Sequence, residues 1–111
     1  MTKLHEMFKG LGDPVRLRIA ALLTQGELCV CDLMEILGLP QSTISRHMAR
    51  LKSAGIVCDR RAGKWVYYSL ENGGFPENIK RFLSHELAEG EPHRSDLKNR
   101  ARHLAAKDHC S

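Results

Sequence analysis

Apolar residues recur at helical spacing along the first half of the chain. Asp13-Pro14 predicts a helix start, because an aspartate can cap free amide groups and a proline fits the first helical turn. The stripe that follows ends at Gly26, and its members are Val15, Ile19, Leu22 and Leu23. A short second helix is predicted over about residues 31–37, and residues 38–40 (Gly-Leu-Pro) end it.

A third helix is predicted from Gln41 to Gly55, and its two faces differ in polarity. Its apolar face consists of Ile44, Met48 and Leu51. Its opposite face is polar and basic and consists of Thr43, Arg46, His47 and Arg50. Such a helix can pack on a core with one side and leave the other side available for binding.

After Gly55 the spacing changes from helical to extended. Residues 56–61 and 65–70 are rich in β-branched and aromatic side chains, and residues 62–64 separate them, which predicts a β-hairpin. A further helical stripe follows in Phe75, Ile79, Phe82, Leu83 and Leu87. This order predicts a mainly α fold with a β-hairpin wing (α+β), the winged helix-turn-helix.

Two parts of the chain differ in composition. Residues 1–90 carry the elements described above and are expected to form one domain. Residues 91–111 are expected to form a polar C-terminal tail that is partly helical or disordered, with at most a weak helix at about 95–106.

The basic charge of the chain is concentrated in one stretch. The 111 residues carry a net charge of +4, yet residues 41–64 hold six basic side chains against Asp59 alone. A concentrated positive charge is expected where a chain lies against a polyanion such as DNA. A merely solvated basic face is the alternative.

The third helix and the hairpin tip predict a surface that binds double-stranded DNA. A helix that enters the major groove needs donors for base edges and phosphates. The candidates on the helix are Gln41, Ser42, Thr43, Ser45, Arg46, His47 and Arg50. The hairpin tip adds Arg60, Arg61 and Lys64, whose cations suit phosphates or an adjacent minor groove. An ordinary amphipathic helix with a cationic turn is the alternative, and the concentrated charge disfavours it.

Two apolar segments are candidates for a dimer interface. Specific DNA sites usually need two half-sites, so we expect a homodimer. The candidate interface consists of Leu4, Met7, Phe8, Phe75, Ile79, Phe82 and Leu83. The alternative is that these side chains only complete the core of one chain.

Cys29 and Cys31 lie one residue apart at the predicted start of the second helix. On a regular helix, residues i and i+2 point about 200° apart, so the two thiols would diverge. In an extended segment they share a face and their sulfurs converge. The pair can therefore form a site for a soft ion. A ligand that clamps both thiols would favour the extended form and oppose winding of the helix start, which would alter DNA binding.

Thiolates bind soft ions such as zinc, cadmium, lead and copper(I), and trivalent arsenic and antimony are also thiophilic. Two other interpretations stay open: the thiols are small buried apolar residues, or oxidation of the pair releases DNA. An enzyme is not expected, because catalytic redox pairs separate their cysteines by two residues beside a βαβ pattern, which this sequence does not show.

The chain carries no apolar run near the ~20 residues of a membrane span, and its N-terminus does not resemble a signal peptide. We therefore expect a cytoplasmic protein without a membrane partner. In that compartment the four cysteines are expected to be reduced thiols or metal ligands.

Three segments together resemble the ArsR/SmtB family of bacterial metal-responsive repressors: ELCVCDL, QSTISRHMARLKSAGIV and DRRAGKWVYYSL. The resemblance covers about residues 4–90 and is strongest to the members that sense arsenic and antimony, whose sensor motif reads CVCDL. It implies a homodimeric winged-helix repressor that leaves its operator when As(III) or Sb(III) binds, with no catalytic cofactor. Cys29 and Cys31 match the sensor cysteines, residues 41–50 the recognition helix, and residues 60–64 the wing.

The resemblance leaves the third ligand open. The family motif often continues CVCDLC, and this chain has Met34 at that position, whereas a trivalent arsenic centre prefers three sulfurs. The candidates are Cys58, which lies in an apolar context on the first predicted strand, and Cys110 in the polar tail. Water or a small cellular thiol could also complete the site.

The resemblance also allows other metals. Cadmium and lead sensors of the family add cysteines from an N-terminal arm, and the arm of this chain offers only His5, which disfavours that alternative. A zinc site on the last helix, built from histidines and carboxylates across the dimer, is a further alternative, with candidate ligands His85, Glu86, Glu89 and His93.

Overall fold

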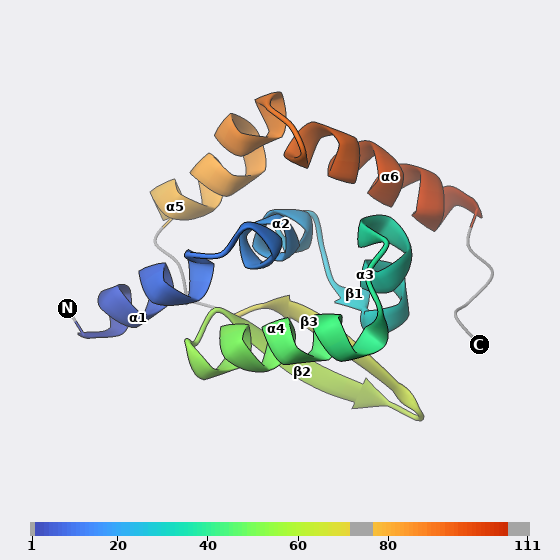
Figure 1. Cartoon of the computed structure of the whole chain (residues 1–111), viewed down its shortest axis with the longest axis horizontal. Helices are drawn as coiled ribbons and strands as arrows, with labels where there is room; N and C mark the ends of the chain where they lie inside the picture. The colour runs from blue at the N-terminus through green and yellow to red at the C-terminus, as the bar shows by residue number, and fades with distance from the viewer. Residues whose placement is uncertain (1, 72–76, 107–111) are drawn as a thin grey trace.

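Figure 1 shows the computed structural model of the chain, which describes residues 2–71 and 77–106. Helices and strands follow in the order α1 (Thr2–Leu11), α2 (Pro14–Leu23), β1 (Leu28–Cys29), α3 (Val30–Leu37), α4 (Gln41–Ser53), β2 (Val57–Ala62), β3 (Trp65–Leu70), α5 (Glu77–Arg81), a π-helical turn η1 (Phe82–Glu86), a 3-10 turn η2 (Leu87–Glu89) and α6 (His93–Ala106). The predicted helix, turn, helix and hairpin arrangement is confirmed.

The predicted start of α2 is confirmed in atomic detail. Asp13 Oδ1 accepts hydrogen bonds from the N–H groups of Val15 (2.8 Å) and Arg16 (3.1 Å), and Pro14 is the first helical residue. Burial opposes ionisation of the carboxyl, but the two N–H donors together with the charges of Arg16 and His47 outweigh it, so the pKa of Asp13 lies below its ordinary value.

A tight turn sets the angle between α3 and α4. Gly38 adopts a left-handed conformation with a φ of 68°, and its N–H donates to the Met34 carbonyl at 2.8 Å. This backbone conformation favours glycine, because it costs any side chain steric strain. Pro40 then precedes the first residue of α4, Gln41. The turn thus ends α3 and starts α4 within three residues.

The sheet has three antiparallel strands in the order β1-β3-β2. The predicted hairpin forms β2 and β3, with Val57 opposite Leu70 and Ala62 opposite Trp65. The two-residue strand β1 was not predicted. It adds Leu28 opposite Tyr68 and Cys29 opposite Tyr67, and so anchors the cysteine motif to the hairpin.

The core lies between α2, α3, α4 and the sheet, and α2 is its central helix (Figure 1). The predicted inward-facing residues of α4, Ile44, Met48 and Leu51, are all fully buried. On the side of α2 away from α4 and the hairpin, α5 and α6 run across the molecule (Figure 1).

Helix α6 extends the weak helix expected at about 95–106 and packs on α2 and α3. Two bonds fix it there. Asp96, buried within the fold, forms a two-pronged ion pair with Arg18 of α2, at 2.9 Å to Nε and 2.8 Å to Nη2. His103 contacts Asp32 of α3. The second half of the chain therefore supports the helix that carries the cysteine pair.

Candidate functional site

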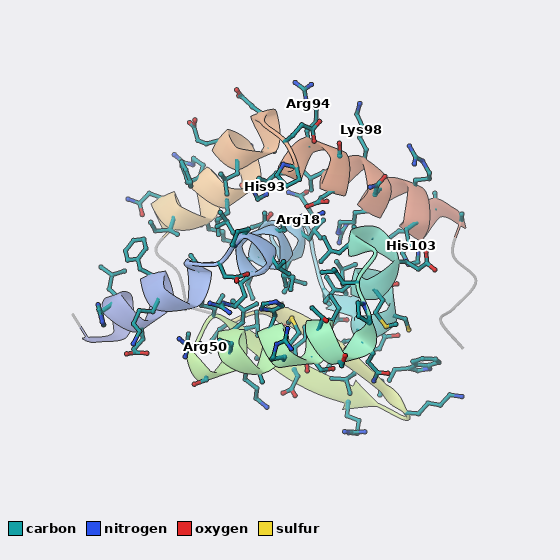
Figure 2. The ribbon with its side chains drawn as sticks, viewed as in Figure 1. Arg18, Arg50, His93, Arg94, Lys98 and His103 are labelled. Carbon is teal, nitrogen blue, oxygen red and sulfur yellow. The ribbon has the colours of Figure 1, made fainter. Side chains whose placement is uncertain are left out.

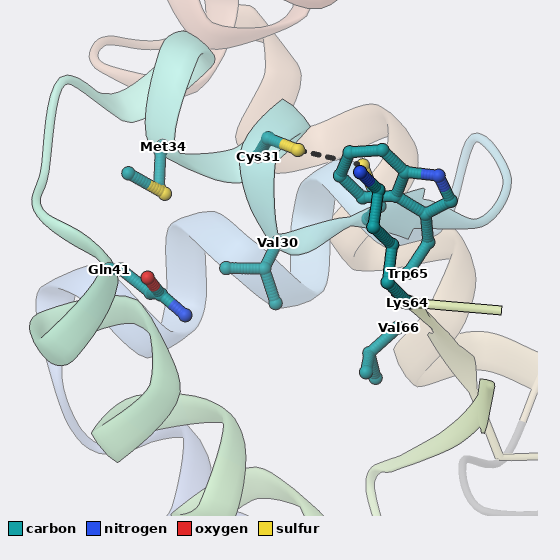
Figure 3. A pocket seen from close by; sticks show the side chains of 8 residues that line it. Val30, Cys31, Met34, Gln41, Lys64, Trp65 and Val66 are labelled. Carbon is teal, nitrogen blue, oxygen red and sulfur yellow. Dashed lines mark hydrogen bonds between the residues drawn. The ribbon is translucent and has the colours of Figure 1, made fainter. Parts of the chain in front are cut away.

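The sulfurs of Cys29 and Cys31 lie 3.6 Å apart (Figure 3). This is far longer than a disulfide bond of about 2.05 Å, so the two residues are separate thiols. One ion with tetrahedral ligand angles and bonds of about 2.3 Å holds two sulfurs about 3.8 Å apart. The pair therefore has the spacing that two ligands of one soft ion need.

The pair spans the junction between β1 and α3. Cys29 has an extended backbone with a φ of −88° and a ψ of 169°, whereas Cys31 is the second residue of α3. The helix begins at Val30, one residue earlier than expected. The backbone changes from extended to helical between the two cysteines. The sulfurs therefore converge without a fully extended segment and without a regular helix through both residues.

Asp32 fixes the start of α3. Its Oδ2 accepts the N–H of Cys29 at 3.0 Å, which caps the helix from its third residue. Its Oδ1 lies 2.7 Å from His103 Nε2 of α6, a residue labelled in Figure 2. Asp32 is only 1% exposed, so both contacts are shielded from water. Through Asp32, the cysteine pair is therefore tied to His103, which lies 71 positions after Asp32 along the chain.

A cavity of about 210 Å³ opens beside the two thiols (Figure 3). Its walls come from three parts of the fold: the start of α3, the first residue of α4 and the hairpin. The lining residues are Cys29, Val30, Cys31, Met34, Gln41, Lys64, Trp65 and Val66. A ligand bound there would touch elements of both predicted DNA-contacting segments.

The sequence did not predict this cavity. Lys64 Nζ lies 5.3 Å from the centre of the Trp65 ring, and this cation–π contact forms one wall. Met34 of α3 lines the same space. The sequence signals that were present are the aromatic residue directly after the hairpin turn and the methionine three residues after Cys31.

No group of three or more His, Cys, Asp or Glu side chains within residues 2–71 and 77–106 is arranged to hold a metal ion. Cys58 lies on β2, and β1 and β2 pair with opposite edges of β3. Cys29 lies opposite Tyr67 and Cys58 opposite Ser69, so the two backbones are two strand spacings apart and two residues out of register, more than about 10 Å from each other. Its thiol is half-buried rather than in the core, 3.4 Å from Ser69 Oγ. Cys110 lies outside the described residues.

The candidate zinc ligands differ in their exposure within one chain. His85, Glu86 and Glu89 are exposed around η1 and η2, whereas His93 is buried at the start of α6. The Nδ1 atom of His93 is buried without a hydrogen-bond partner among the described groups. Burial lowers the pKa of His93, Asp96 opposes this shift, and Arg18 adds to it.

The face of α4 opposite the core exposes five of the seven predicted DNA-contacting residues: Gln41, Ser42, Ser45, Arg46 and Arg50. Thr43 and His47 are half-buried. His47 Nδ1 lies 3.4 Å from Nη1 of Arg16 on α2, so part of its side chain contacts the fold. The exposed face is polar and carries two arginines that can meet phosphates or base edges.

The three basic residues of the hairpin differ in their surroundings. Arg61 is exposed, and Lys64 is exposed beside Trp65. Arg60 forms a two-pronged ion pair with Glu27, at 2.6 Å and 3.0 Å, and stacks over the Tyr67 ring at 4.7 Å. The hydrogen bond from Arg60 lowers the pKa of Glu27. Arg60 therefore links the hairpin to the segment just before β1.

The predicted dimer residues divide into two groups. Met7 and Leu83 are buried in the core of the single chain, and Phe75 lies outside the described residues. Leu4, Phe8 and Phe82 are exposed, with Phe8 at 54% and Phe82 at 48%, while Ile79 is half-buried. α1, which carries Leu4 and Phe8, lies at the same end of the molecule as α5, which Phe82 directly follows (Figure 1).

Comparisons with known proteins agree with this geometry. Residues 13–58 match the family model described as "Bacterial regulatory protein, arsR family". Arsenic resistance transcriptional regulator ArsR1 of Pseudomonas putida is 54% identical over 65 residues, which are 58% of this chain and 51% of that protein. ArsR2 of the same organism is 47% identical over 79 residues, 70% of this chain and 68% of that protein. The match thus spans only about half the length of ArsR1.

Two further similarities extend the comparison. A cadmium resistance transcriptional regulatory protein CadC homolog of Staphylococcus aureus is 39% identical over 82 residues, 73% of this chain and 68% of that protein. The homodimeric winged helix-turn-helix DNA-binding domain of Mb0332 from Mycobacterium bovis superposes with a TM-score of 0.64 at 26% identity, covering 97% of this chain and 89% of that one. These proteins are regulators rather than enzymes, in agreement with the sequence prediction, and the fold is the predicted winged helix-turn-helix.

Of the helices in the described part of the chain, none is both long enough and apolar enough to cross a membrane.

Proposed function

Because the chain belongs to the arsR family of bacterial regulatory proteins, we propose that it is a homodimeric, cytoplasmic transcriptional repressor that releases DNA when trivalent arsenic or antimony binds Cys29 and Cys31. The observation that carries this proposal is the 3.6 Å separation of the two sulfurs beside a cavity that reaches both α4 and the hairpin. Arsenic resistance regulators among its relatives support the choice of ligand.

DNA is the proposed partner of the exposed face of α4 and of the hairpin tip. Arg46 and Arg50 are exposed on α4, and Arg61 and Lys64 on the hairpin. Four cations on two neighbouring elements can neutralise phosphates on either side of a groove. Two copies joined through Leu4, Phe8 and Phe82 would present two such surfaces to two half-sites.

The cavity supplies the proposed coupling between ligand and DNA. Gln41 is the first residue of α4 and Lys64 follows the hairpin turn, and both line the space beside the thiols. We expect a second conformation, in which Gln41 and Lys64 are displaced and DNA affinity is lower. A ligand that binds this conformation more tightly shifts the protein toward it and so releases DNA. The sulfurs are already close enough for one ion, so this mechanism does not require α3 to unwind.

Two alternatives make different predictions. A cadmium, lead or zinc sensor is supported by the cadmium resistance relative, because the same sulfur spacing suits those soft ions. A thiol-redox repressor would release DNA when an oxidant acts on the pair in the absence of metal. Both keep the same fold and the same DNA partner, so only the identity of the inducer separates them.

The test is fluorescence anisotropy of a DNA duplex selected from random sequences for binding to the reduced chain. The complex is titrated at fixed salt with arsenite, antimonite, cadmium, lead, zinc and peroxide. We expect arsenite and antimonite to release DNA from the native chain and from a Cys58→Ser/Cys110→Ser control, but not from Cys29→Ser/Cys31→Ser. Equal release from the Cys29→Ser/Cys31→Ser variant, or release by peroxide alone, would contradict the proposal.

A further inference from the structure

The cavity beside the cysteine pair is larger than a single ion requires. An ion bound to two sulfurs through bonds of about 2.3 Å lies at the edge of the space, next to the sulfurs themselves. The cavity measures about 210 Å³. For comparison, an apolar protein cavity of about 150 Å³ holds a benzene molecule. Most of the volume therefore remains for a group attached to the ion.

The walls of this space are suited to an organic group. Val30, Met34 and Val66 contribute aliphatic surface, and the indole of Trp65 contributes an aromatic one. An apolar group gains free energy by leaving water for such a surface, and an aromatic group gains more by packing on the indole. Figure 3 shows these side chains surrounding the space on the side of α3 that faces the hairpin.

We propose, as a refinement that rests on the proposed function, that the site preferentially binds monosubstituted trivalent organic arsenicals. Cys29 and Cys31 supply both sulfur ligands, and the organic substituent occupies the space lined by Trp65 and Val66. A carbon–arsenic bond fills the third position of the trivalent centre. No third cysteine is then needed, in keeping with the described residues, where no group of three His, Cys, Asp or Glu side chains that could hold a metal ion is found.

The binding step is a ligand exchange without a change of oxidation state. The monosubstituted arsenical enters with two hydroxyl groups on arsenic. Each thiol forms one arsenic–sulfur bond, one arsenic–oxygen bond breaks, and the thiol proton leaves with the hydroxyl as water. Two waters are released in total. Inorganic arsenite would react in the same way but would keep one hydroxyl as its third ligand, and an added thiol could exchange for that hydroxyl with release of a third water.

The single tryptophan of the chain is Trp65, so its fluorescence reports directly on the occupied cavity. The full-length reduced chain is titrated with phenylarsenous acid, methylarsenous acid and arsenite in a non-thiol reductant, so that no added thiol completes the arsenite complex. Native mass spectrometry counts arsenic per chain. We expect one arsenical per chain and dissociation constants that fall from arsenite to methyl to phenyl, with phenyl at least about tenfold tighter than arsenite.

Val66 provides the variants that separate the cavity from the thiols. Val66→Phe fills the space and should weaken the phenyl arsenical about tenfold while changing arsenite affinity less than about twofold. Val66→Ala, the matched control, removes atoms from the same wall and should leave the phenyl arsenical bound tighter than arsenite.

Two results would overturn the inference, and they are distinguishable from each other. If arsenite binds Cys29 and Cys31 as tightly as the phenyl arsenical, or if Val66→Phe weakens both equally, the organic preference is wrong while arsenic sensing stands. If no arsenical binds the native chain more tightly than it binds Cys29→Ser/Cys31→Ser, the proposed function fails as well.

Discussion

The cysteine site and the exposed face of α4 differ in how many contacts their side chains make within the chain. Asp32 holds the start of α3 through Cys29 and His103, and the two sulfurs lie at the spacing of two ligands of one ion. Arg46 and Arg50, in contrast, make no ion pair with any described residue. The ligand site is preorganised, whereas the proposed DNA surface gains its partners only when DNA binds.

The hairpin combines both properties. Arg61 and Lys64 point outward with their charges exposed, while Arg60 is bound to Glu27 and stacked on Tyr67. The sequence predicted the same DNA-contacting role for all three. The ion pair with Glu27 also places Arg60 next to the segment that leads into the cysteine motif, so Arg60 connects the hairpin to the cysteine site.

Removing the carboxylate of Asp32 has the largest expected effect. Asp32→Ala leaves the N–H of Cys29 and the ring of His103 without this buried acceptor, and we expect the free energy of unfolding to fall by about 2 kcal/mol. Urea denaturation at constant pH measures it. Asp32→Asn keeps one acceptor oxygen and should lose less. A loss below about 0.5 kcal/mol would show that the site is not held by this contact.

Arg46→Ala probes the exposed face of α4. This side chain is exposed, so we expect stability to change by less than about 0.5 kcal/mol. We expect DNA affinity to fall by about 1–3 kcal/mol, because a charged contact to a base or phosphate is lost. Anisotropy with the selected duplex and urea denaturation of the same sample give the two numbers. Unchanged DNA affinity would remove α4 from the proposed interface at this position.

Glu27→Gln tests whether Arg60 belongs to both regions. Without its ion pair, the guanidinium is available to a phosphate, so DNA affinity should rise and the salt dependence should steepen by about 0.9 in log–log slope. Binding is measured at several salt concentrations. The same substitution in an Arg60→Ala background should have no such effect. An unchanged slope in the native background would place Arg60 outside the DNA contact.

The smallest expected effect concerns pH. Burial lowers the pKa of His93, so in the folded chain this ring resists protonation while the unfolded chain still takes up the proton near pH 6.5. The unfolded state binds more protons in that window, and stability should therefore fall as the pH drops below about 6.5. His93→Gln should flatten this dependence in urea denaturation from pH 7 to pH 5. A pH dependence identical to that of the native chain would contradict the assignment.

Local signals predicted much of the fold. The cap of α2 by Asp13, the apolar face of α4 and the hairpin all depend on residues within a few positions of each other. The candidate DNA residues followed from the same helical periodicity, and the structure exposes five of the seven on α4.

Long-range contacts could not be predicted in this way. Strand β1 is only two residues long and forms because Leu28 and Cys29 meet Tyr68 and Tyr67. The contact of Asp32 with His103 joins residues 71 positions apart. The cavity requires the hairpin to fold back beside α3, which brings Trp65 next to the thiols. Each depends on tertiary packing, for which a single sequence gives no local pattern.

One titration tests the central claim most directly. Arsenite is added to the complex of the Cys58→Ser/Cys110→Ser variant with a fluorophore-labelled duplex, while Trp65 emission and DNA anisotropy are recorded together. We expect both signals to change in parallel and to reach their end points at one arsenic per chain. DNA release with no change at Trp65, or the same release after Cys29→Ser/Cys31→Ser is added, would contradict it.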